Sequence, residues 1–187
     1  MQITYQNKEY LNQNPSIPSI NKVTDDDMNE IKTVVNANYT DTQNAISHIN
    51  EYITASPSSD VTLTTTNATK LSLDTSTSVG SSLSLDNGSI LIGAGVSKIL
   101  INANILFSTG GTGSTTSDRK GMNIQKNTTA VHYCSIPSTA TYIGCSLSPF
   151  LLDVQENDVI TLNGVNQGAT GSVVSAAQTY ITVKVVE

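Results

Sequence analysis

Apolar residues recur at alternating steps of three and four between Thr24 and Thr54, which predicts one helix with a heptad seam. Thr24 can cap this helix, and the three aspartates that follow lie in the first turn, where the helix dipole favours negative charge. The seam positions are Met28, Ile31, Val35, Asn38, Thr42, Ala45, Ile49 and Tyr52. Such a seam is buried only against other helices, so partner chains are expected. An amphipathic helix packed on its own chain is the alternative.

Two polar residues lie in the middle of the seam, Asn38 at a d position and Thr42 at the next a position. Polar groups at such positions cost stability but fix the register and the number of helices. They suit hydrogen bonds between symmetry-related chains, but the seam alone leaves the number of chains open. A parallel trimer is favoured mainly because of the resemblance of the C-terminal β region described below.

After the helix the pattern changes from a helical period to a period of two. Residues 55–60 form a Ser/Pro linker, and from Val61 to the C-terminus short alternating segments predict strands. Asn87-Gly88 between two such segments indicates a hairpin. In the most regular segment Ile99, Ile101, Ala103, Ile105 and Phe107 share one face. Many short strands without helices between them predict a mainly β sandwich or barrel over residues 61–187.

The first 23 residues are polar and irregular, with Pro15 and Pro18 among scattered apolar side chains. A stretch of this kind cannot bury enough surface to fold alone. We expect an anchoring arm that becomes ordered on another protein, and a frayed terminus is the plainer alternative.

Composition narrows the classes of function. The net charge of −6 and the pI near 4.7 argue against a nucleic-acid partner, which would need clustered Lys and Arg. The first residues carry no apolar core of signal-peptide length, and no later segment approaches a membrane span. We therefore expect no membrane partner and a protein made in a cytoplasm.

Cys134 and Cys145 lie in consecutive predicted strands, and a turn at Thr139 to Ala140 would place them opposite each other. A disulfide between them is then geometrically feasible, but two reduced thiols are the favoured state in a reducing compartment.

No constellation predicts catalysis, a metal site or a cofactor. His48 and His132 have no catalytic or metal-binding spacing around them, and both are interpreted as solvated or packed histidines. Asp153, Glu156 and Asp158 share one turn and could offer oxygen ligands to Ca²⁺, but a solvated corner is the favoured interpretation. An enzyme is not expected.

The densest charges of the β region are Asp118, Arg119 and Lys120, in a Gly/Ser/Thr-rich segment from Ser108 to Gly121. A mobile loop of this kind on a rigid sandwich is a candidate receptor contact. Plain solvated surface is an equal alternative.

The β region resembles the C1q/tumour-necrosis-factor jelly roll, a sandwich that assembles as a trimer. The resemblance lies in LLDVQENDVITLNG (151–164), in the closing TYITVKVVE (179–187) and in ILINANILFS (99–108). It implies a jelly-roll knob whose trimer axis is packed by aromatic residues. The candidates for this packing are Tyr133, Tyr142, Phe150 and Tyr180.

Residues 15–39 resemble the N-terminal segment of phage fibre and appendage proteins, in which an arm precedes a short trimeric stalk. Arm (1–23), stalk (24–54), linker (55–60) and knob (61–187) together imply a homotrimeric virion fibre of the head or the tail. Its implied partners are capsid, tail or baseplate proteins at residues 1–23 and a host-surface glycan at the knob. A secreted C1q-like binding module is the alternative, and a glycan-cleaving tailspike is a third hypothesis that would need paired carboxylates.

Overall fold

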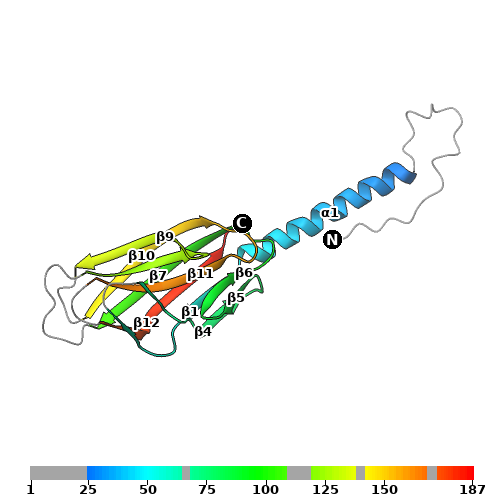
Figure 1. Ribbon diagram of the computed structural model, residues 1–187. Coiled ribbons are helices and arrows are strands. Elements are labelled where there is room, and N and C mark those ends of the chain that lie inside the picture. Colours follow the sequence, from blue (N-terminus) through cyan, green and yellow to red (C-terminus); the bar gives the residue numbers. More distant parts are fainter. Residues whose placement is uncertain (1–24, 65–67, 109–118, 138–141, 168–171) are drawn as a thin grey trace, which may run out of the picture. The chain divides into compact units, whose positions relative to one another are not determined.

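The computed structural model describes residues 25–64, 68–108, 119–137, 142–167 and 172–187. The chain divides into two units, Met1–Ser47 and His48–Glu187. Within the described residues there is one helix, α1 (Asp25–Ile49), and the remaining elements are strands (Figure 1). The predicted arm, residues 1–23, lies outside the described residues.

The seam spacing predicts a helix that continues to Thr54, and this is wrong at the C-terminal end. Helix α1 ends at Ile49, and Tyr52–Ser56 forms strand β1 instead. The segment is rich in aromatic and β-branched residues, which favour strands, and its Ile53 is buried at 1% exposure. The predicted linker 55–60 is shortened for the same reason, since Ala55 is fully buried in β1.

Twelve strands form two antiparallel sheets within the described part of the chain. Sheet A has the order β10-β7-β12-β1-β4, with β2 also paired to β12, and sheet B has the order β5-β6-β11-β8-β9, with β3 also paired to β11. The strands of sheet A are β1 (Tyr52–Ser56), β2 (Val61–Leu63), β4 (Thr75–Val79), β7 (Lys98–Ser108), β10 (Tyr142–Asp153) and β12 (Ser172–Val185). Those of sheet B are β3 (Ala68–Lys70), β5 (Leu83–Asp86), β6 (Ser89–Ile92), β8 (Arg119–Lys126), β9 (Thr129–Pro137) and β11 (Val159–Gln167).

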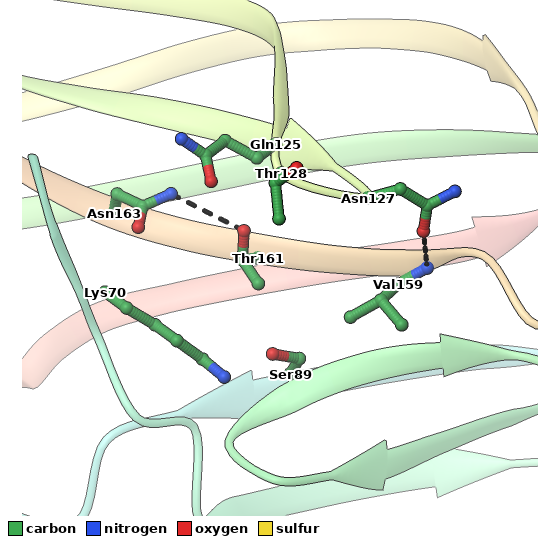
Figure 2. A pocket seen from close by; sticks show the side chains of 8 residues that line it. All are labelled: Lys70, Ser89, Gln125, Asn127, Thr128, Val159, Thr161 and Asn163. Atoms are coloured by element: carbon green, nitrogen blue, oxygen red, sulfur yellow. Dashed lines mark hydrogen bonds between the residues drawn. The ribbon is translucent and has the colours of Figure 1, made fainter.

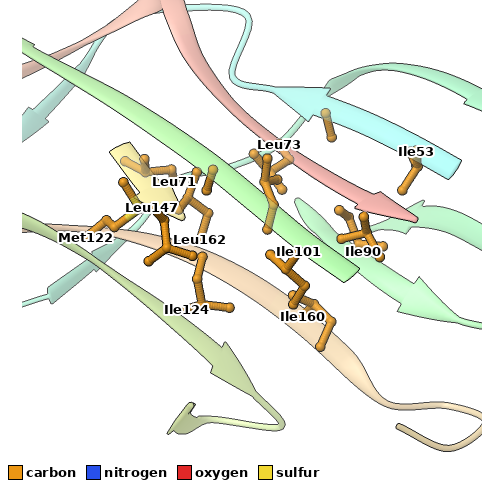
Figure 3. Packing of buried hydrophobic residues seen from close by; sticks show 14 of the residues in the cluster. Ile53, Leu71, Leu73, Ile90, Ile101, Met122, Ile124, Leu147, Ile160 and Leu162 are labelled. Atoms are coloured by element: carbon orange, nitrogen blue, oxygen red, sulfur yellow. The ribbon is translucent and has the colours of Figure 1, made fainter. Parts of the chain in front are cut away.

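The core lies between the two sheets and follows the alternation of the strands. In β7 every second residue is fully buried, as the sequence predicts: Ile99, Ile101, Ala103, Ile105 and Phe107. Strand β11 contributes Ile160 and Leu162 from the opposite sheet, and these side chains belong to the same buried cluster as Leu73 and Ile90 (Figure 3). The alternation therefore fixes which face of each strand remains available for other contacts.

Two hairpins of sheet B turn through left-handed residues. Asn87 (φ 46°) and Gly88 (φ 72°) join β5 to β6, which confirms the predicted Asn-Gly hairpin. The β8–β9 turn has the same backbone form at Asn127 (φ 49°) and Thr128 (φ 72°), although Thr, with its branched Cβ, adopts it rarely.

Candidate functional site

The described seam side chains of α1 are mostly exposed. Ile31 is 53% and Val35 39% exposed, and Asn38 and Thr42 are exposed as well, whereas Met28 is half-buried. The Thr42 hydroxyl donates to the carbonyl of Asn38 at 2.7 Å, so its only proton is used inside the helix. The side chains of Ala45 and Ile49 lie outside the described residues.

The last predicted seam residue, Tyr52, belongs to the sandwich and not to the helix. It is half-buried in β1, opposite Lys184 of β12 and Val79 of β4. Three further apolar side chains of α1, off the predicted seam, are exposed: Val34 at 51%, Tyr39 at 43% and Ile46 at 51%. The apolar stripe of the helix is therefore wider than the heptad pattern predicts.

The outer face of sheet A, turned away from the core, carries exposed apolar side chains together with charged ones, since the strand register also places Lys98, Asp153 and Lys184 on it. Strand pairing places Tyr142 (69% exposed) and Leu151 (58%) of β10 on this face, together with Val79 (47%) of β4 and Tyr180 (37%) of β12. Thr54 and Thr182 share a hydroxyl hydrogen bond of 2.9 Å near its centre. These four side chains are spread over the face, because Tyr142 and Leu151 lie near opposite ends of β10 and Val79 lies on the opposite edge strand. Several large exposed apolar side chains on one sheet face suit a protein–protein contact.

Of the four aromatic residues predicted for a trimer axis, Tyr142 and Tyr180 lie on this face of sheet A. Tyr133 is 47% exposed on strand β9 of the other sheet. Phe150 points inward, and its ring stacks on His132 with the centroids 4.6 Å apart. Sequence alone could not assign these faces, because the bulge between Leu147 and Phe150 changes the alternation within β10.

The predicted receptor loop is only partly described. Asp118 lies outside the described residues, whereas Arg119 and Lys120 begin strand β8. Lys120 is fully buried and donates a hydrogen bond to the Asn166 side chain, so the expectation that it lies in an exposed loop is wrong. Arg119 is exposed, and its Nε donates to Ser135 Oγ at 3.1 Å.

The acidic turn is organised by hydrogen bonds around Asp158. This carboxylate is 2% exposed, accepts from Asn127 Nδ2 at 2.5 Å and from the Gln155 N–H at 3.0 Å, and lies 3.4 Å from Lys126 Nζ. Burial acts to raise the pKa of Asp158, but these donors together outweigh burial and lower it. Among the described residues no three potential metal ligands cluster, and here donors already occupy the carboxylate.

The two cysteines face each other across the open side of the sandwich. Strands β9 and β10 are edges of different sheets, and no backbone pairing joins them within the described residues. Cys134 Sγ and Cys145 Sγ are 3.0 Å apart, and both cysteines are free thiols. Cys145 is buried, and this burial, with the neighbouring Cys134, raises its pKa to about 12.

A pocket of about 470 Å³ lies on the outer face of sheet B, and most of its surface comes from the apolar parts of its lining side chains. Its floor is β11, where Val159, Thr161 and Asn163 alternate with core residues. Lys70 of β3 and Ser89 of β6 border one side, and the other side is formed by Gln125, Asn127 and Thr128 of β8 and its turn (Figure 2). Sequence reasoning missed this pocket, because its walls come from four separate segments and no local motif marks it.

No family model matches the chain, and no curated protein matches its sequence. Solved structures do match its fold. The crystal structure of murine APRIL at pH 5.0 superimposes with a TM-score of 0.55 at 12% identity, covering 73% of this chain and 98% of the chain in that structure. The sandwich is a jelly roll of the tumour-necrosis-factor type. This confirms the predicted fold class.

Two further solved structures have a fold similar to this jelly roll. Eiger TNF from S. frugiperda has a TM-score of 0.50 at 9% identity, covering 73% of this chain and 92% of its own. PRD1 vertex protein P5 has a TM-score of 0.54 at 13% identity, covering 74% of this chain and 99% of its own. At such identities the likeness concerns the fold. No described helix is long and apolar enough to cross a membrane.

Proposed function

We propose that the protein is a homotrimeric structural protein of a phage particle. Residues 1–23 attach it to other virion proteins, α1 forms a three-helix stalk, and the jelly roll is displayed for host-surface attachment or capsid decoration. The observation that carries the proposal is the outer face of sheet A, where four large apolar side chains are 37–69% exposed.

Two further copies of the chain are the occupants that fit this face. The face carries Tyr142 and Tyr180, and tyrosines are enriched at the centres of protein interfaces. The same chain also exposes an apolar stripe on α1, so both units offer a surface for self-association. Two weak contacts on one chain reinforce each other, because formation of either one raises the local concentration for the other.

The phage setting is supported by the fibre-like residues 15–39 and by the similarity of the fold to PRD1 vertex protein P5. Mass spectrometry of purified particles would detect the chain in virions, and a label on its N-terminus would be located on them by electron microscopy. A chain that is secreted from cells and absent from every particle would refute the virion role and favour the soluble ligand-binding alternative.

Analytical ultracentrifugation tests the trimer, with an expected mass three times the chain mass of 19.7 kDa. Leu151→Asp and Tyr142→Asp place a carboxylate on the outer face of sheet A and should shift the protein towards monomer. Tyr133→Asp is the matched control, because Tyr133 is 47% exposed on sheet B and should leave the trimer intact. A monomeric wild type, or a trimer that tolerates Leu151→Asp, would refute the proposed assembly.

A further inference from the structure

We propose that the pocket on sheet B binds a sugar unit of a surface polysaccharide, with the carboxylate of an acidic sugar placed on Lys70. The inference rests on the proposed attachment function and assigns a ligand class to a defined site. The cavity of about 470 Å³ lies within the range of roughly 300–1,000 Å³ that is usual for small-molecule sites, and it has room for one or two sugar rings.

The first argument is the Ser89 hydroxyl. Ser89 is 1% exposed, lines the pocket, and its Oγ has no hydrogen-bond partner. Figure 2 shows this oxygen directed to the side on which Lys70 lies. A buried hydroxyl without a partner is unfavourable, and a ligand hydroxyl or carboxylate that pairs with it removes the penalty.

The second argument is the supply of donors and acceptors around Ser89. Lys70 Nζ donates to the carbonyl of Asn87 at 2.6 Å, and an ammonium group has three donors in all. Thr161 and Gln125 add a hydroxyl and an amide, which both donate and accept. The Asn163 nitrogen already donates to the Asn123 carbonyl at 3.3 Å and to Thr161 Oγ1 at 3.5 Å, so Asn163 adds its amide oxygen as an acceptor. Sugar hydroxyls both donate and accept hydrogen bonds, so these groups suit them. The ammonium group of Lys70 adds a positive charge that would pair with a sugar carboxylate.

The third argument is the backbone of the β8–β9 turn at the rim. Thr128 has φ 72°, a left-handed conformation that β-branched residues rarely adopt, and it lines the pocket with Asn127. Strained residues of this kind gather at binding sites.

The position of the pocket fits the proposed assembly. Its floor residues Thr161 and Asn163 alternate with the core residues Ile160 and Leu162, so they lie on the face of sheet B that is turned away from sheet A. A trimer assembled through sheet A would leave all three pockets open, and three copies would convert weak single-site binding into firm attachment.

Saturation-transfer NMR of the full chain tests the inference, with methyl β-glucuronide as the acidic probe and methyl β-glucoside as the neutral probe. We expect millimolar binding of both, tighter for the glucuronide. Ser89→Ala should weaken the binding of both probes about two- to tenfold, which is the usual effect of losing one neutral hydrogen bond. Lys70→Met should weaken the binding of the glucuronide by at least tenfold. Ser89→Ala should melt no lower than wild type, because it removes an unpaired hydroxyl.

Ser172→Ala is the matched control. Ser172 is also 1% exposed with an unpaired Oγ, but it lies on β12 and does not line the pocket, so its replacement should leave binding unchanged. Absence of signal for both probes, or binding that neither pocket variant weakens, would overturn the inference. Equal affinity for the two probes would overturn the role of Lys70. If the protein is a trimeric virion protein that binds neither sugar, only the proposed sugar site is refuted. If it is a monomer that binds the sugars, only the proposed trimer is refuted.

Discussion

Oxidation of the pair formed by Cys134 and Cys145 should stabilise the jelly roll. The two residues are eleven positions apart, and a disulfide that closes a loop of this size constrains the unfolded chain by about 3 kcal/mol. For a domain of this size, 1 kcal/mol corresponds to roughly 2–4 °C in melting temperature, so we expect a rise of about 6–12 °C.

The chemistry of the pair also sets the order of the reaction. Burial raises the pKa of Cys145 to about 12, so its thiolate is scarce near neutral pH, and the half-buried Cys134 should attack first. With glutathione disulfide as oxidant, Cys134 forms a mixed disulfide and Cys145 then displaces glutathione. The two thiols lose two hydrogens, and two glutathione molecules are released in reduced form.

The assay is thermal unfolding of the full chain after treatment with glutathione disulfide or with dithiothreitol, with free thiols counted in both samples. Cys145→Ala is the control and should show no rise. Complete loss of free thiols within single chains without a rise in melting temperature would refute the loop argument. An equal rise in Cys145→Ala would show that the stabilisation has another source.

Three further perturbations test the packing of the jelly roll. Asp158→Asn should lower the free energy of unfolding by about 1–3 kcal/mol in urea titrations at pH 7, because its buried hydrogen bonds are weakened. The pKa of Asp158 is lower in the folded protein than in the unfolded chain, so its carboxylate stabilises the fold above about pH 4, and this stabilisation should decrease as the pH falls further. If Asp158→Asn lowered the free energy of unfolding as much at pH 2 as at pH 7, this explanation would be wrong. Gly88→Ala should cost about 1–3 kcal/mol, because φ is +72° and the added Cβ would lie 2.6 Å from Ser72 Oγ; an unchanged melting temperature would argue against this turn. Phe107→Ala should cost about 3–5 kcal/mol by chemical denaturation, and a cost below 1 kcal/mol would show that this site is not the packed core.

The features that local sequence predicted are those set by short-range rules. The alternation in β7 identified all five of its core residues, because a strand between two layers must bury every second side chain. Asn87-Gly88 marked a hairpin because both residues tolerate positive φ.

The features that sequence did not predict depend on distant partners. Tyr52 continues the heptad spacing of the helix, but β12 and β4 pair with its segment and make it a strand. Lys120 looks exposed beside two other charges, but it is buried in β8, where its ammonium donates to Asn166, 46 positions further on. The buried Ser89 shows its unpaired hydroxyl only after β6, β8 and β11 have come together.

The place of β1 between β12 and β4 has a practical consequence for dissecting the protein. A fragment that starts at residue 61, where the strand pattern becomes obvious, would lack an interior strand and leave the backbone amides of β12 and β4 unsatisfied. Such a bare edge recruits strands from other molecules, and the fragment should aggregate. A truncated protein that keeps the jelly roll intact has to begin before Glu51, because the carbonyl of Glu51 accepts a hydrogen bond from the Val185 N–H at 2.9 Å.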